Sequence, residues 1–148
     1  MSRRYYTVAE VNRLVPRLET IFVHVLQLRA GMRAEEVKLQ RAGVDIAAGL
    51  AETPGESDSL TVRHGKAMFR AFYDTLVERL AEVEQLGGEI KDLETGLVDF
   101  LARRRDEDIL LCWKLGEREV SFWHTPESGF RGRRPIDDDV PQDPTPLD

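Results

Sequence analysis

A seam of apolar residues at helical spacing fills the first third of the chain. Thr7-Val8-Ala9-Glu10 can form a capping box, in which the hydroxyl and the carboxylate satisfy backbone amides at a helix start. From there the apolar positions alternate at three and four residues: Val11, Leu14, Leu18, Ile21, Val25, Leu28, Met32 and, after a break at Glu35, Leu39. This spacing predicts a helix from residue 7 to about residue 48.

Pro16 lies inside this pattern. Proline lacks an amide donor and disfavours helical torsions at the preceding residue, so we expect a kink or a short first helix. The apolar phase passes through Pro16 unchanged, and both pieces should therefore face the same partner.

A second helical stretch follows the polar segment from Gly49 to Ser59, which predicts an exposed loop. Its apolar stripe comprises Phe69, Phe72, Leu76, Leu80, Val83 and Leu86, and Gly87-Gly88 predicts a left-handed stop. The two helices should form a long antiparallel, coiled-coil-like hairpin over residues 7–87. Two helices cannot cover their own seams, so we expect a homodimer through the helices.

The region 89–136 predicts strands. Ile109–Leu115 and Arg118–His124 flank Gly116-Glu117, which suits a type II′ turn. That register places His124 on the face of Trp113, and Trp123 with Cys112 on the opposite, outer face, where Lys114 pairs with Glu119. A third strand is expected at 89–93 or 97–100. The predicted fold is α+β: a helical hairpin followed by a small antiparallel sheet of two to three strands.

The charge distribution separates a body from a tail. The chain has 148 residues and a net charge of −6, and five of its 27 acidic residues lie in 137–148. We expect one domain over 1–136 and a disordered acidic tail over 137–148. The nearly neutral body makes nucleic acid an improbable partner.

Cysteine content and hydropathy bear on location. The single cysteine rules out an intramolecular disulfide, and no apolar run is long enough for a membrane span or a secretory signal. We therefore expect a cytoplasmic protein with no membrane partner.

Four segments, YTVAEVNRLVPRL, EIKDLETGLVDF, LCWKLGE and WHTPESGFRGRRPI, resemble an uncharacterised bacterial family, domain of unknown function 2203. The resemblance covers both ends of the chain and implies a fold but no established activity. The segment from Leu101 to Asp108, with its three arginines, departs from the family pattern.

The chemistry-bearing residues fit no catalytic template. A thiol nucleophile at Cys112 with His124 as base is disfavoured because the expected register sets them on opposite faces. His124 could bind a metal with Glu127, or with Asp92 and Asp99, but no paired-histidine spacing supports this. We predict no catalytic residues, no metal site and no cofactor.

Arginines near the end of the chain are a better candidate. Trp123, His124, Arg131, Arg133 and Arg134 could bind an anion or a partner, because guanidinium groups pair with phosphate and carboxylate. The alternative is a structural latch, in which the arginines pair with Asp137–Asp139 and Phe130 packs near Trp123.

Two functions remain open. The first, which we favour at this point, is a non-enzymatic interaction or scaffold protein that acts through the helical hairpin and the sheet. The alternative is a small-molecule or phosphoanion binder, or an enzyme, built on the cluster from Trp123 to Arg134.

Overall fold

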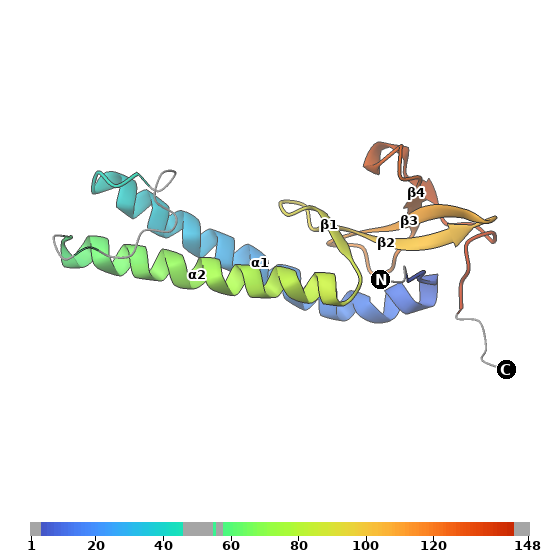
Figure 1. Ribbon diagram of the computed structural model, residues 1–148, viewed down its shortest axis with the longest axis horizontal. Helices are drawn as coiled ribbons and strands as arrows, with labels where there is room; N and C mark the ends of the chain where they lie inside the picture. The colour runs from blue at the N-terminus through green and yellow to red at the C-terminus, as the bar shows by residue number, and fades with distance from the viewer. Residues whose placement is uncertain (1–3, 46–54, 56–57, 144–148) are drawn as a thin grey trace. The chain divides into compact units, whose positions relative to one another are not determined.

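The computed structural model describes residues 4–45, 55 and 58–143, which form an α+β fold (Figure 1). Two helices, α1 (Val8–Arg41) and α2 (Leu60–Gln85), precede a five-stranded antiparallel sheet. The chain divides into two compact units, one of Met1–Phe22 with Glu82–Asp148 and the other of Val23–Ala81. Within the described residues, no helix is long and apolar enough to cross a membrane.

The start of α1 confirms the predicted capping box. The Thr7 amide donates to Glu10 Oε1 over 3.0 Å, and the Glu10 amide donates to Thr7 Oγ1 over 3.2 Å. The helix then passes through Pro16 without a break, so the expectation of a short first helix was wrong. Its apolar face is buried on both sides of the proline, at Val11, Val15 and Leu18, and this packing offsets the one lost hydrogen bond. The helix ends at Arg41 rather than near residue 48.

The end of α2 is the glycine stop that the sequence predicts. Gly87 has a φ of +93°, and its amide donates to the Glu84 carbonyl, while the Gly88 amide donates to the Val83 carbonyl. This pair of bonds is a Schellman motif, which satisfies carbonyls that a helix end leaves open.

In the unit of Val23–Ala81, the two helices pack as an antiparallel hairpin. Leu39, Val62 and Phe69 form a buried cluster. A Cβ built at Gly65 would lie 3.0 Å from Leu39, and one built at Gly31 would lie 2.9 Å from Phe72. Residues later in α2 therefore contact residues earlier in α1, as expected for two antiparallel helices.

The sheet has five strands, not the two to three expected. These are β1 (Glu89–Asp92), β2 (Leu97–Arg104), β3 (Glu107–Lys114), β4 (Phe122–His124) and β5 (Arg134–Pro135), which neighbour one another in chain order. A single-turn helix, η1 (Phe130–Gly132), precedes β5. Both expected positions for a third strand are occupied, by β1 and β2. The edge strands are short: β1 carries Glu89, Lys91 and Asp92, and β5 contains Pro135.

The tight hairpin turn lies between β2 and β3, at Arg105-Asp106, where φ is 50° and 66°. Two positive φ values in a two-residue loop are the signature of a type I′ turn. The prediction that Gly116-Glu117 alone connects β3 to β4 as a two-residue turn was wrong. The Glu117 amide does close a turn onto the Lys114 carbonyl, but the loop continues to Ser121 before β4 begins.

This longer loop shifts the register of β4 by one residue. Leu110 pairs with His124, Leu111 with Trp123 and Cys112 with Phe122. A one-residue shift moves every side chain of a strand to the other face. Trp123, expected on the outer face, therefore shares the face of Leu111, and His124 shares the face of Cys112.

One face of the sheet forms the core of this unit. Its buried side chains are Val98, Phe100, Ala102, Ile109, Leu111, Trp113 and Trp123. Phe22 of α1 lies against Trp113, with ring centroids 6.1 Å apart. The Val120 amide donates to Asn12 Oδ1 of the same helix over 2.7 Å.

The described part of the expected tail packs onto the start of α1. The first two helix amides, of Val8 and Ala9, donate to the carbonyls of Pro141 and Gln142 over 3.0 and 2.8 Å. Val140 is 1% exposed. Residues 141 and 142 thus supply acceptors for amides that a helix start leaves without intrahelical partners. Residues 144–148 lie outside the described residues.

Candidate functional site

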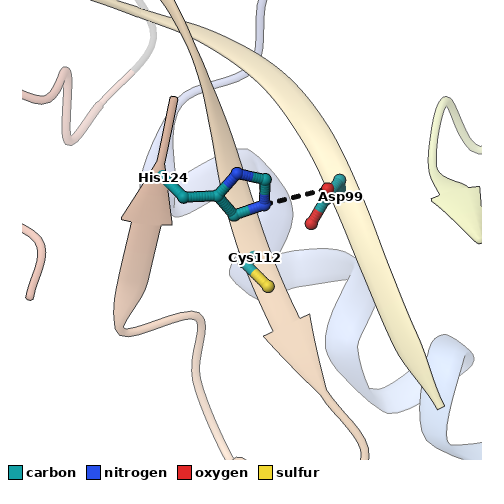
Figure 2. A group of neighbouring side chains, drawn as sticks. All are labelled: Asp99, Cys112 and His124. Atoms are coloured by element: carbon teal, nitrogen blue, oxygen red, sulfur yellow. Dashed lines mark hydrogen bonds and ion pairs between the residues drawn. The ribbon is translucent and has the colours of Figure 1, made fainter. Parts of the chain in front are cut away.

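Opposite the core face, three strands bring a carboxylate, a thiol and an imidazole together. Asp99 of β2 pairs directly with Cys112 of β3, and His124 of β4 lies diagonally across β3 from Asp99. The ligand atoms of the three side chains all lie within 4.8 Å of one another (Figure 2). All three residues are buried, at 2%, 0% and 3% exposure respectively.

The contact between His124 and Asp99 fixes where protons can be. His124 Nδ1 lies 2.8 Å from the Thr125 carbonyl oxygen, which only accepts, so Nδ1 carries a proton and donates it. Nε2 lies 3.0 Å from Asp99 Oδ2 (Figure 2). With Nδ1 protonated, a neutral ring would direct its Nε2 lone pair at a carboxylate oxygen. The contact therefore requires a proton or another cation between Nε2 and Oδ2.

The loop after β4 keeps the Thr125 carbonyl in place as the acceptor for His124 Nδ1. The amide of Ser128 donates to Thr125 Oγ1 and the amide of Thr125 to Ser128 Oγ, over 3.1 and 3.2 Å. Reciprocal bonds of this kind close the loop upon itself. The Thr125 carbonyl is thus a fixed acceptor for His124 Nδ1. Nε2 is therefore the ring nitrogen that remains for another contact.

Cys112 is held as a neutral thiol by its surroundings. Burial, and next the Asp99 carboxylate, raise the pKa of Cys112 to about 12. Because the thiolate is the nucleophile, this thiol is unreactive at neutral pH. The sequence placed Cys112 and His124 on opposite faces of the sheet, and this was wrong because the two share a face. The raised pKa of the Cys112 thiol is the reason why the pair does not form a nucleophile and base.

A pocket of about 410 Å³ opens over the same face. Asp99 and His124 line its floor, Leu97, Leu110 and Phe130 supply apolar wall, and Lys91, Asp92 and Lys114 supply charge. Lys91 pairs with Glu89 at 2.6 Å. Lys114 is half-buried as a residue, and its ammonium makes no hydrogen bond or ion pair with any residue that the structure describes. The volume lies in the range of small-molecule sites.

The residues predicted as one cluster separate in space. His124 lines the pocket, whereas Trp123 belongs to the core face, where its Nε1 donates to the Pro135 carbonyl. Arg134 lies over the Trp123 ring, with its Cζ 5.5 Å from the centroid. Arg131 is exposed.

Arg133 is bound within the fold. Its guanidinium donates to the Cys112 carbonyl over 3.0 Å and to Glu117 over 2.7 Å. It also lies over the rings of Phe122 and Phe130, at 4.3 and 5.0 Å from their centroids. Phe130 itself is 46% exposed and lines the pocket rather than covering Trp123. Asp137 and Asp139 pair with Arg104 and Arg105, not with Arg131–Arg134.

Sequence reasoning left Lys114 out of the candidate site, and it considered Asp99 only as a metal ligand beside His124 and set it aside. A signal for Asp99 existed: it is the one charged residue in the apolar run Leu97–Ala102. A carboxylate in such a run is rarely buried without a partner. Lys114 had been assigned to a cross-strand pair with Glu119, which the shifted register does not form.

Fold and site together define an α+β protein whose sheet carries a buried carboxylate, thiol and imidazole on one face, beside a pocket. The chain belongs to the family of uncharacterised conserved proteins DUF2203, whose model matches residues 4–136. The family resemblance predicted from the sequence is thereby confirmed. The comparisons with curated proteins and with solved structures found no match. The family description assigns no activity, so a function has to be argued from the geometry.

Proposed function

We propose that the protein binds a small organic anion in the pocket over Asp99 and His124. The observation that carries this proposal is the composition of the pocket: an apolar wall, a polar floor and Lys114, whose ammonium has no partner among the described residues. Ligand sites commonly combine these parts, with the apolar surface supplying affinity and a few polar groups supplying orientation.

Lys114 is the group that selects for negative charge. Lys114 lines the pocket and is half-buried as a residue. A partly desolvated ammonium that lacks an internal partner gains more from an anionic ligand than a surface lysine does. Lys91 is a weaker candidate because Glu89 already neutralises it.

The test uses two probes of the same shape and different charge, anilinonaphthalene sulfonate and the neutral N-phenylnaphthylamine. We expect the sulfonate to bind more tightly, and Lys114→Met to weaken it about tenfold, as for a lost hydrogen bond to a charged group. Lys38→Met, which removes an exposed lysine of α1, is the matched control. Unchanged sulfonate affinity in Lys114→Met, measured by fluorescence titration, would contradict the proposal.

A second proposal concerns self-association, with the protein acting as an interaction protein. Large apolar side chains are exposed at helical spacing on both helices of the Val23–Ala81 unit: Val23 at 49% and Leu26 at 40% on α1, and Tyr73 at 39% and Val77 at 48% on α2. Apolar residues repeated one turn apart support a coiled-coil-like contact between copies. We therefore propose a homodimer through these helices, tested by the mass in solution.

We also propose a cytoplasmic location and one folding domain over 1–136, onto whose first helix residues 137–143 pack. The location is supported by the free thiol of Cys112, which is typical of a reducing compartment. Fractionation of the native host tests it, and a single cooperative melting transition tests the domain assignment.

A further inference from the structure

We propose that Asp99, Cys112 and His124 form a binding site for a divalent transition-metal ion, with Zn²⁺ the best fit. This site is distinct from the anion contact at Lys114 and does not depend on it. The three donors come from three neighbouring strands, and the His124 ring is directed at Asp99 with Cys112 beside them (Figure 2).

The spacing of the donors suits one ion. Their ligand atoms lie within 4.8 Å of one another, and the closest pair, His124 Nε2 and Asp99 Oδ2, is 3.0 Å apart. Bonds of about 2.0–2.3 Å to zinc place tetrahedral ligands roughly 3.3–3.6 Å apart. Shifts of about an ångström in the side chains would therefore close the site on an ion.

A second, independent observation supports a bound cation: electron pairs on Asp99 and His124 lack a partner that a cation could supply. Asp99 Oδ1 is buried and has no hydrogen-bond partner among the described residues. The other oxygen faces His124 Nε2, whose lone pair is directed at it because Nδ1 donates to Thr125. An ion at this point would accept both lone pairs and satisfy the orphaned oxygen, whereas a proton satisfies only the Nε2–Oδ2 contact.

The charges balance when the ion binds. The ion displaces the proton between His124 and Asp99 and the thiol proton of Cys112, and both leave to solvent. One carboxylate and one thiolate then neutralise the divalent ion, which lowers the cost of burying it.

The surroundings resemble those of a metal centre. A ligating histidine normally donates its second nitrogen to a carbonyl or carboxylate, as His124 Nδ1 does to Thr125. Asp99 and His124 also line the pocket. The fourth position of a tetrahedral ion would thus be open to water or a ligand from the pocket, as in catalytic zinc sites.

The donor set narrows the choice of ion. One nitrogen, one oxygen and one sulfur make a borderline site, which favours zinc and its spectroscopic substitute cobalt over magnesium or calcium. We therefore expect Zn²⁺ and Co²⁺ to bind at one equivalent and Mg²⁺ not to compete.

The experiment titrates chelator-treated full-length protein with Co²⁺ alone. We expect the near-ultraviolet thiolate-to-cobalt charge-transfer band and strong visible bands of tetrahedral cobalt, both lost on addition of one equivalent of Zn²⁺. Cys112→Ser should abolish the charge-transfer band, and Asp99→Asn or His124→Gln should weaken Zn²⁺ binding about 100-fold. His64→Gln, which changes an exposed histidine of α2, is the matched control and should bind like wild type.

The wild-type spectrum decides the question even if a variant fails to fold, a failure that circular dichroism would detect. Absence of the charge-transfer band in folded wild-type protein would overturn the proposal. Its persistence in Cys112→Ser would overturn it too. Because no organic anion is present, either result leaves the test of Lys114 unaffected.

Discussion

At the scale of single residues, the hydroxyl of Tyr6 occupies the space that a side chain at position 87 would need. A Cβ at Gly87 would overlap the Tyr6 hydroxyl, which donates to the Leu86 carbonyl over 2.8 Å. The backbone at Gly87 also has φ +93°. A substitution there meets a steric cost and a conformational cost at once.

Gly87→Ala should therefore lower the free energy of unfolding by about 2–3 kcal/mol, from a positive φ of about 1–2 kcal/mol and a displaced hydrogen bond of about 1 kcal/mol. Gly116→Ala is the matched control, because φ is +105° there but nothing lies within 4 Å of the added Cβ. It should cost only the conformational part. Equal losses in urea denaturation would show that Tyr6 moves freely.

Cys112 makes stability depend on pH in the alkaline range. The folded protein raises its thiol pKa from 9.0 to about 12, so it holds the proton more tightly than the unfolded chain does. This stability is present in full below pH 9 and is lost as pH rises toward 12. The loss over three units is at most about 4 kcal/mol, at about 1.4 kcal/mol per unit.

The measurement compares wild type and Cys112→Ala by denaturation between pH 8 and about pH 11, with chelator present. Cys112→Ala should be less stable at pH 8 but should lack the additional alkaline loss. Parallel stability curves for the two proteins would contradict the assigned pKa.

What the sequence reveals about the site is limited by register. Cys112 and His124 were recognised as chemically notable, but the assumption of a two-residue turn at Gly116 set them on opposite faces. Turn glycines suggest a loop type without fixing its length, and the turn at Gly116 is real although the loop runs on to Ser121. One residue of error then reversed the faces of β4.

At the scale of elements, the strongest sequence patterns predicted the start of α1 and the end of α2. The capping box at Thr7 and the Gly87-Gly88 stop both form as expected, because each depends on local bonds. The contacts of the segment 137–143 could not be predicted because they are long-range. Its composition is acidic with a single proline, and only the fold reveals that the start of α1 lies beside it.

Truncation after Asp137 should consequently lower the melting temperature by several degrees. It removes the buried Val140 and the acceptors for the Val8 and Ala9 amides. Val140→Ala should cost about 2 kcal/mol, for two buried carbon groups plus a cavity.

Truncation after Asp143 is the control, since it keeps every contact described for this segment. Equal melting temperatures for wild type and the chain ending at Asp137 would show that these contacts contribute nothing.

At the scale of the whole molecule, Ile21 had been expected at a dimer interface. It is 4% exposed within the chain itself. The periodicity identified the buried stripe of α1 correctly, and in this unit the chain itself meets part of the helix, since Phe22 lies against Trp113 and Asn12 accepts from the Val120 amide. Periodicity alone does not distinguish an internal partner from a second copy.

The proposed dimer should therefore respond to Leu26→Asp and not to Leu60→Asp. Leu26 is 40% exposed in the midst of α1, with Val23 one turn away, whereas Leu60 is 83% exposed at the first position of α2. A carboxylate buried between copies is costly, so Leu26→Asp should give a monomer. Light scattering measures the mass; a monomeric wild type at micromolar concentration would contradict the dimer.

The two edges of the sheet bear on how copies of this protein avoid aggregation. An open edge presents unpaired amides and carbonyls to any neighbouring strand. Here β1 is four residues long, irregular in its pairing between Ile90 and Asp92, and charged, while β5 has two residues, one of them a proline without an amide. Neither edge is a template for another strand. The native protein therefore disfavours the addition of a strand from a second copy at either end of its sheet.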